Sequence, residues 1–177
     1  PNHTQRWTKA FKDMVQNDST GVLNIFLVNV EAFATVKACT HVEEFLVTHD
    51  AMMAIDESTT IKNPKAKRTK HLIKLGPLAD YRRILTGFPI TKAPLDLYSQ
   101  CYFLSPNLLG FSSFYAFQAR YAITQSRQMG RHAFQQVMGF QKLDELQESI
   151  KDFSIRRRKE ECLDLPPKVY TRRMVEL

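Results

Sequence analysis

The sequence predicts an α/β domain, a three-layer sandwich in which a mainly parallel sheet lies between two layers of helices. Short apolar runs that suit buried strands alternate with longer segments whose apolar residues recur at helical spacing. The 177 residues, 44% of them hydrophobic, are also enough to bury the core of one domain. One compact α/β domain is therefore expected.

The first half of the chain supplies three of the expected helices and two of the strands. Helical spacing of apolar residues predicts helices at 3–14, 37–48 and 66–75. Continuous apolar runs predict buried strands at 22–28 and 51–55. The second of these strands stops at two acids, Asp56 and Glu57.

The second half is less regular. Strands are expected at 83–86 and 153–155, and helices at 95–104 and 143–150. Residues 111–140 are aromatic and Gln-rich with weak periodicity, which favours helices and loops but defines no boundaries. After two prolines, the last residues are again strand-like.

The amino-acid composition limits which partners, cysteine sites and membrane segments are expected. The formal net charge of +7 favours a polyanionic partner, although charge alone is a weak signal. Cys39, Cys101 and Cys162 form no CxxC pair, so we expect reduced, buried thiols instead of a zinc site or a disulfide framework. The apolar runs are shorter than the roughly 20 residues of a membrane helix, so a soluble protein without a membrane partner is expected.

The paired acids carry the strongest chemical signal. Open parallel sheets bind ligands at the carboxyl ends of their strands, which is where Asp56 and Glu57 are expected. Such acids suit nucleotide hydrolysis, with Asp56 holding Mg²⁺ through water and Glu57 deprotonating the attacking water. Taken alone, however, an apolar run followed by two acids more often marks a strand end and a capping acid.

Five segments in order resemble the Swi/Snf family of ATPases that depend on double-stranded DNA. AMMAIDESTTIKNP at 51–64 resembles the Walker B element of that family, and LTGFPI at 85–90 resembles its LTGTPI segment. Similarity in the same order covers the Trp motif at 1–11, the FLSP stretch at 95–106 and, at 153–167, an arginine-rich segment that resembles the family's FxxRRxKxExxxDLPPK signature. Together these matches cover essentially the whole chain.

The resemblance implies a RecA-like lobe of the P-loop NTPases at 1–164 and a connector toward a second lobe at 165–177. It implies ATP and Mg²⁺ as cofactors of the complete protein, with Asp56 and Glu57 in the roles given above. The resemblance also implies a coupling motif that senses the nucleotide, formed by Thr86, Gly87 and Pro89. The partner implied is double-stranded DNA, and the candidate contacts are Arg6, Asn29, Lys62, Lys65, Lys67 and Arg68. For the lysines of this set, a solvated helix face is an equal alternative.

The chain departs from the family at three positions. Ser58 stands where many relatives have Ala or Gly, Thr59 stands where they have His, and Phe88 replaces a small Thr. The DES form of the acid motif resembles phage and prokaryotic members. A phage or bacterial source and a cytoplasmic location are therefore expected.

A further departure is the lack of a G-x-x-x-x-G-K-[ST] phosphate-binding loop, since none of the six glycines precedes a Lys-Ser/Thr pair. In the family that loop precedes the Trp motif, so the lobe is expected to be incomplete at its amino end. The missing segment and the second lobe would come from a longer chain or another chain. These 177 residues alone are expected not to hydrolyse ATP.

The alternative to a motor lobe is a non-catalytic, basic module, derived from such a lobe, that binds nucleic acid or a partner. A separate expectation concerns residues 169–177, whose equivalent in the family belongs to the second lobe. This segment is expected to be disordered or to pair with the sheet edge of a neighbouring molecule.

Overall fold

The computed structural model describes residues 3–16, 21–129, 132–162, 164 and 169–174. The chain divides into two units, 1–143 and 144–177, which are described separately. The domain boundary expected after residue 164 adjoins residues outside the described part and stays a prediction.

A two-stranded parallel sheet forms the centre of the first unit. It consists of β1 (Met52–Ile55) and β2 (Tyr81–Ile84), with Met52 opposite Tyr81 and Ile55 opposite Ile84. The strand expected at 51–55 is thus confirmed, and the one expected at 83–86 begins two residues earlier. Side chains alternate across β1, so that Met53 and Ile55 are buried whereas Met52 is 60% exposed.

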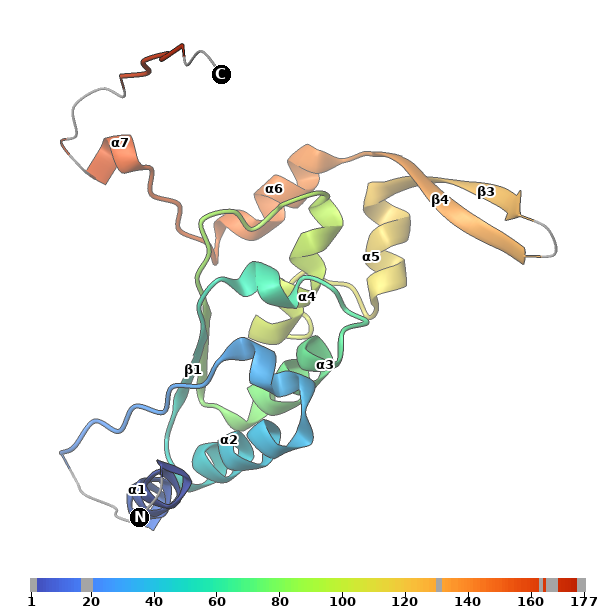
Figure 1. Ribbon diagram of the computed structural model, residues 1–177. Helices are drawn as coiled ribbons and strands as arrows, with labels where there is room; N and C mark the ends of the chain where they lie inside the picture. The colour runs from blue at the N-terminus through green and yellow to red at the C-terminus, as the bar shows by residue number, and fades with distance from the viewer. Residues whose placement is uncertain (1–2, 17–20, 130–131, 163, 165–168, 175–177) are drawn as a thin grey trace. The chain divides into compact units, whose positions relative to one another are not determined.

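Helices cover one face of this sheet. Figure 1 shows α2 (Val36–Thr48), α3 (Lys67–Leu75) and α4 (Leu97–Leu104) gathered on one side of β1. Their buried side chains form the core with Met53 and Ile55, and Leu72 of α3 and Phe103 of α4 are each only 1% exposed. On the other face Tyr81 is 71% exposed. The α/β class is confirmed, but among the described residues the sheet has helices on one face, and the three-layer sandwich is not confirmed.

The helices expected from apolar spacing are all present. The helix expected at 3–14 is α1 (His3–Gln16), and that expected at 143–150 is α6 (Leu143–Lys151). Phe11 of α1 is buried, with its ring centroid 5.2 Å from Phe26 and 5.1 Å from His41. No helix in the described part of the chain is long and apolar enough to cross a bilayer.

The strand expected at 22–28 is wrong. The segment is extended, and Phe26 and Val28 pack on the core while Leu23 and Leu27 are 84% and 87% exposed. A strand also needs a hydrogen-bonded neighbour, and no described strand pairs with this segment. The continuous apolar run indicated an extended segment, but it did not predict the exposure of alternate side chains or the lack of a described partner strand.

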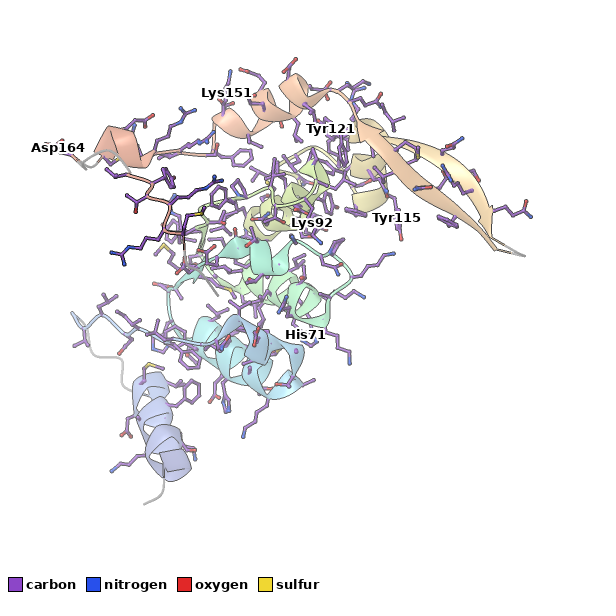
Figure 2. All side chains as sticks on the ribbon, turned by 45° about the horizontal axis from the view of Figure 1, so that its top comes forward. His71, Lys92, Tyr115, Tyr121, Lys151 and Asp164 are labelled. Atoms are coloured by element: carbon purple, nitrogen blue, oxygen red, sulfur yellow. The ribbon has the colours of Figure 1, made fainter. Side chains whose placement is uncertain are left out.

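The expectation of helices and loops at 111–140 is wrong for most of that segment. After α5 (Phe114–Tyr121) the chain forms an antiparallel hairpin of β3 (Ala122–Met129) and β4 (His132–Phe140). Tyr121 lies where α5 joins this hairpin (Figure 2). This segment carries no strand pattern because side chains on both faces of the hairpin are exposed, so apolar and polar residues do not alternate.

The second unit contains α7 (Lys159–Cys162) after most of α6. No regular structure is present at 153–155, so the short strand expected there is wrong. Residues 169–174 have no regular secondary structure and 175–177 lie outside the described part, so the expectation for 169–177 stays a prediction. Cys101 is buried as expected, Cys39 is half-buried, and Cys162 is exposed, contrary to expectation.

Candidate functional site

The two parallel strands bring the predicted acids and the predicted coupling motif to one edge of the sheet. Asp56 and Glu57 follow β1, and Leu85 and Thr86 follow β2. Two backbone hydrogen bonds extend the pairing past the strand ends, from Leu85 N to Ile55 O and from Ser58 N to Leu85 O, each 2.9 Å long. The segments that resemble the Walker B and LTGTPI elements therefore run side by side.

Glu57 lies at a sharp change of backbone direction. Its φ of 48° and ψ of 57° place it in the left-handed region, which costs a residue other than glycine roughly 1–3 kcal/mol. The turn ends the strand and starts the short 3-10 helix η2 (Ser58–Ile61). Thr86 Oγ1 donates to Glu57 Oε2 at 3.4 Å, and Glu57 N donates to Asp56 Oδ1 at 2.9 Å. The turn thus positions the two acids beside Thr86.

Both carboxylates are exposed and can reach a ligand at the strand ends. Mg²⁺ commonly binds one or two protein carboxylates and takes its other ligands from phosphates and water. Among the described residues, no cluster of three or more His, Cys, Asp or Glu side chains could hold a metal ion without such a ligand. Asp56 and Glu57 alone could therefore supply only part of the ligands of such an ion.

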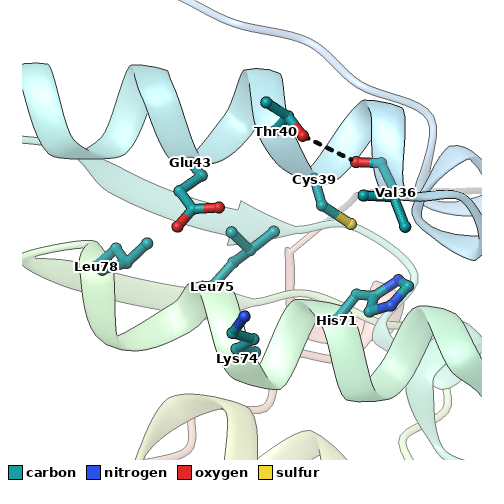
Figure 3. A pocket seen from close by; sticks show the side chains of 8 residues that line it. All are labelled: Val36, Cys39, Thr40, Glu43, His71, Lys74, Leu75 and Leu78. Atoms are coloured by element: carbon teal, nitrogen blue, oxygen red, sulfur yellow. Dashed lines mark hydrogen bonds between the residues drawn. The ribbon is translucent and has the colours of Figure 1, made fainter.

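A groove of about 210 Å³ between α2 and α3 does not include these acids (Figure 3). It is lined by Val36, Cys39, Thr40, Glu43, His71, Lys74, Leu75 and Leu78. His71 Nδ1 lies 2.7 Å from Phe33 O, and burial raises the pKa of the Cys39 thiol. None of the predicted site residues lines this groove.

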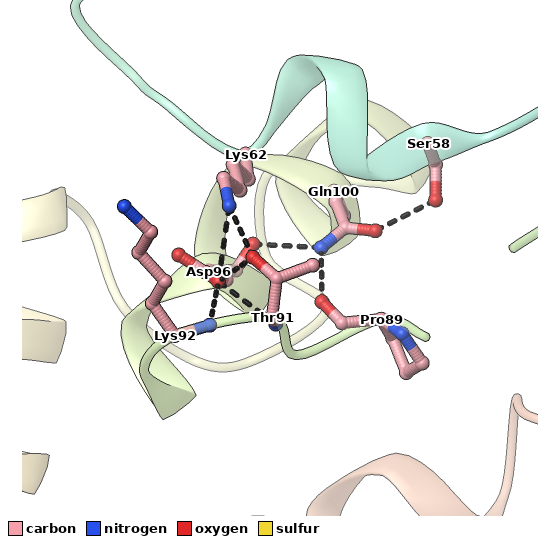
Figure 4. A network of polar contacts seen from close by, with 7 residues as sticks. All are labelled: Ser58, Lys62, Pro89, Thr91, Lys92, Asp96 and Gln100. Atoms are coloured by element: carbon pink, nitrogen blue, oxygen red, sulfur yellow. Dashed lines mark hydrogen bonds and ion pairs between the residues drawn. The ribbon is translucent and has the colours of Figure 1, made fainter. Parts of the chain in front are cut away.

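A network of polar contacts begins at Ser58, the residue that follows the two acids (Figure 4). Ser58 Oγ donates to Gln100 Oε1 at 2.6 Å, and Gln100 Nε2 donates to the carbonyls of Pro89 at 2.7 Å and Asp96 at 2.8 Å. Ser58 and Gln100 are both fully buried. Gln100 therefore joins the acid segment, the coupling motif and α4. Gln100 was not among the predicted site residues, although Ser58, its partner, was noted as a departure from the family.

Lys62, a predicted DNA contact, has a partner within the protein. Its amine lies 3.6 Å from Asp96 Oδ2 and donates to the Thr91 hydroxyl (Figure 4). Burial of Asp96 favours a higher pKa for its carboxyl, but hydrogen bonds from Lys92 and Thr91 and the charge of Lys62 together lower that pKa below its usual value. Lys62 thus braces the loop after the coupling motif.

The other predicted DNA contacts lie on separate elements. Arg68 Nε donates to Thr60 O at 2.9 Å and so braces η2, and Asn29 Oδ1 accepts from Glu31 N at 2.9 Å. Lys65 and Lys67 are exposed before and at the start of α3. The side chain of Arg6 lies outside the described residues.

The turn of the coupling motif is more open than its glycine suggests. Gly87 is exposed, and a Cβ atom added there would meet no atom within 4 Å. Pro89 is fixed through its carbonyl by Gln100, and Phe88 N donates to Thr86 Oγ1 at 3.2 Å. The geometry therefore depends on Thr86 and Pro89, and steric crowding does not require the glycine.

The arrangement of motifs along the chain agrees with one protein family. A model of the SNF2-related domain family matches residues 4–177. The chain belongs to this family. The resemblance to Swi/Snf ATPases is thereby confirmed, and this SNF2-related domain is of the α/β class expected for part of a RecA-like lobe.

Several curated proteins are similar to this SNF2-related domain. TATA-binding protein-associated factor 172 of Homo sapiens is 40% identical over 118 residues, which cover 65% of this chain and 6% of that protein. TATA-binding protein-associated factor mot1 of Aspergillus fumigatus is 38% identical over 116 residues, covering 65% and 6%. DNA annealing helicase and endonuclease ZRANB3 of Bos taurus is 34% identical over 122 residues, covering 68% and 11%. No solved structure matches this domain.

The domain spans only 6% to 11% of the length of these relatives. Their organisms are a fungus and two mammals, which do not support the phage or prokaryotic source expected from the DES motif. The bacterial or phage-infected cytoplasm stays a prediction.

Proposed function

We propose that this SNF2-related domain is part of an ATP-hydrolysing motor that acts on double-stranded DNA. One observation carries the proposal: Asp56 and Glu57 follow a parallel strand at the sheet edge where Thr86 donates to Glu57. Two of the similar proteins are named for the TATA-binding protein and one is named a DNA annealing helicase. These names support DNA as the substrate of the assembled motor.

Asp56 and Glu57 have different proposed roles. Asp56 would hold Mg²⁺ through water, and Glu57 would orient the attacking water and accept its proton on a carboxylate oxygen. The ion, when bound with ATP, supplies positive charge that neutralises the phosphates. Thr86 supports Glu57 through the hydrogen bond of 3.4 Å between Thr86 Oγ1 and Glu57 Oε2.

The coupling role of Thr86, Gly87 and Pro89 rests on two connections. Thr86 contacts the proposed base, and the Pro89 carbonyl accepts a hydrogen bond from buried Gln100 at 2.7 Å. A shift of Glu57 on hydrolysis would therefore reach α4 through this turn. Exposed Lys65 and Lys67 are the proposed contacts with DNA phosphates, and such contacts position the duplex without reading its sequence.

The remaining parts of the motor are assigned to polypeptide outside these residues. The sequence contains no G-x-x-x-x-G-K-[ST] loop, so the loop, the second layer of helices and the second lobe would belong to a longer chain or to another chain. In the complete protein these parts would produce the three-layer sandwich. The face of the sheet that carries Met52 and Tyr81, 60% and 71% exposed, is available for that second layer.

The test is the DNA-stimulated ATPase of the complete protein that contains this domain. Glu57→Gln should lower kcat by about 100-fold or more, because the proposed base is lost while the shape of the side chain is kept. Glu43→Gln is the matched control, since Glu43 lies on α2 beside the groove and away from the strand edge. Unchanged turnover for Glu57→Gln would remove Glu57 from this role.

The second candidate is a non-catalytic, basic module that binds nucleic acid or a partner protein. The net charge of +7 together with the lack of a phosphate-binding loop motif favours it. A complete protein that binds duplex DNA but neither binds nor hydrolyses ATP would establish this alternative.

A further inference from the structure

The hairpin of β3 and β4 lies in a segment that contains basic residues but no acidic ones. Residues 97–143 contain no Asp or Glu, although the chain has 18 acidic residues, and this segment carries three arginines and one lysine. In the part of the chain that the structure describes, no carboxylate pairs with Arg127 of β3. The hairpin can therefore approach a polyanion without repulsion from acids of its own segment.

One face of the hairpin presents groups that suit nucleic acid. The register places Arg127 opposite Phe134 and Gln125 opposite Gln136, and cross-strand partners share a face. All four side chains are exposed, Phe134 by 46%. The face thus combines a guanidinium, two amides and an aromatic ring.

The base of the hairpin is firmly held. Phe117 and Tyr121 of α5 are 0% and 2% exposed, and the ring of Phe117 lies 5.4 Å from that of Tyr98 on α4. Gln141 N, just after β4, donates to Tyr121 O at 2.9 Å, and Gln141 Nε2 donates to Arg120 O at 3.1 Å. A ribbon anchored in this way loses less entropy on binding than a flexible loop would.

We propose that the β3–β4 ribbon lies in a groove of duplex DNA, with Arg127, Gln125 and Gln136 directed at phosphates and base edges. A two-stranded ribbon fits the major groove, where Arg and Gln side chains pair with guanine and adenine. The exposed apolar side chains of the same face, Ile123 near the base and Phe134 near the turn, are separated by Gln125 and Gln136, whereas a protein interface favours a contiguous apolar patch. Duplex DNA as the ligand rests on the proposed function.

The test uses the 177-residue chain, without nucleotide, and a labelled duplex of about 30 base pairs, titrated by fluorescence anisotropy at several salt concentrations. Arg127→Gln should weaken binding roughly tenfold and reduce the slope of log affinity against log salt by about one. The double variant Gln125→Glu with Gln136→Glu should weaken binding further, because it places negative charge on the same face.

Lys37→Gln is the matched control, since it removes the same charge from an exposed position on α2. Its affinity should stay within about twofold of wild type, because it removes no ribbon contact. Circular dichroism and thermal unfolding should show that all three variants keep the fold.

Three results would overturn the inference. The first is a chain that does not bind the duplex, and the second is an equal loss of affinity in Arg127→Gln and Lys37→Gln. In the third, sedimentation shows that Arg127→Gln alters self-association while leaving DNA affinity unchanged, which would make the ribbon an interface between copies. The ATPase of Glu57→Gln is measured separately. The proposed ATPase activity and the proposed DNA contact of the ribbon can therefore fail independently of each other.

Discussion

The hydroxyl of Ser58 donates to Oε1 of Gln100 across 2.6 Å, and both side chains are fully buried. Ser58 directly follows Glu57, and Gln100 lies on α4. The bond therefore fixes how closely the segment that carries Asp56 and Glu57 packs against α4. It also gives a structural role to a serine that departs from the small apolar residue common in the family.

Replacement of Gln100 should destabilise the domain. In Gln100→Leu the buried Ser58 hydroxyl and the Pro89 carbonyl would lose their partner, and each unsatisfied buried group costs about 1–3 kcal/mol. We expect the free energy of unfolding to fall by roughly 2–4 kcal/mol, measured by urea denaturation. Gln147→Leu on exposed α6 should change it by less than about 0.5 kcal/mol. Equal stability of the two variants would show that the network contributes little.

The carboxyl of Asp96 should make the free energy of unfolding depend on pH. Because its pKa is lowered in the folded chain, its contribution is present above the usual value of 3.8 and is lost as pH falls through the folded pKa. Asp96→Asn should therefore lower the free energy of unfolding by about 1–2 kcal/mol at pH 7, with the difference from wild type shrinking below about pH 4. Denaturant unfolding at several pH values measures this. The exposed Asp50→Asn serves as the control, and a difference for Asp96→Asn that stays constant down to pH 2 would contradict the assignment.

The hydroxyl of Thr86 should affect turnover through Glu57. In the complete protein, Thr86→Val removes the donor to Glu57 Oε2 and should lower DNA-stimulated kcat by roughly tenfold, with little change in KM for ATP. Thr86→Ser keeps a hydroxyl and should retain most of the rate. A serine variant as slow as the valine variant would indicate that the methyl group matters and that the hydrogen bond does not.

The three thiols should differ in reactivity. Burial raises the pKa of Cys101 to about 12, and because the thiolate is the nucleophile, a thiol reagent should not modify Cys101 in the native chain at pH 8. Exposed Cys162 should be the first of the three thiols to react with the reagent, and Cys162→Ser should abolish this fast phase of labelling. Mass spectrometry of labelled peptides, before and after unfolding, tests the order. Labelling of native Cys101 as fast as Cys162 would show that its burial is transient.

Sequence reasoning succeeded where the pattern was local. Helices with an apolar stripe, such as α2 and α3, were predicted within a residue or two, because side chains three and four positions apart share a face. The strand before Asp56 was also predicted, since a short apolar run stops at two acids. The order of the motifs identified the family, which the match over residues 4–177 confirmed.

Sequence reasoning failed where a partner distant in sequence decides the outcome. The extended segment at 22–28 carries a strand pattern but has no described strand to pair with, and the exposed β3–β4 hairpin carries no apolar alternation. Lys62 looked like any other basic residue of its cluster. Its ion pair with Asp96 could not be foreseen, because α3 and β2 separate the two residues in the chain.

The sequence by itself determined the family, the helices and the placement of two acids at a strand end, because these properties depend on neighbouring residues. Only the tertiary structure decided that Glu57 meets Thr86, that Gln100 supports Ser58, and that Arg127 shares a face with Phe134. Each of those contacts needs chain segments to be brought together by sheet pairing, by hairpin pairing or by core packing. Spacing along the chain carries little information about such contacts.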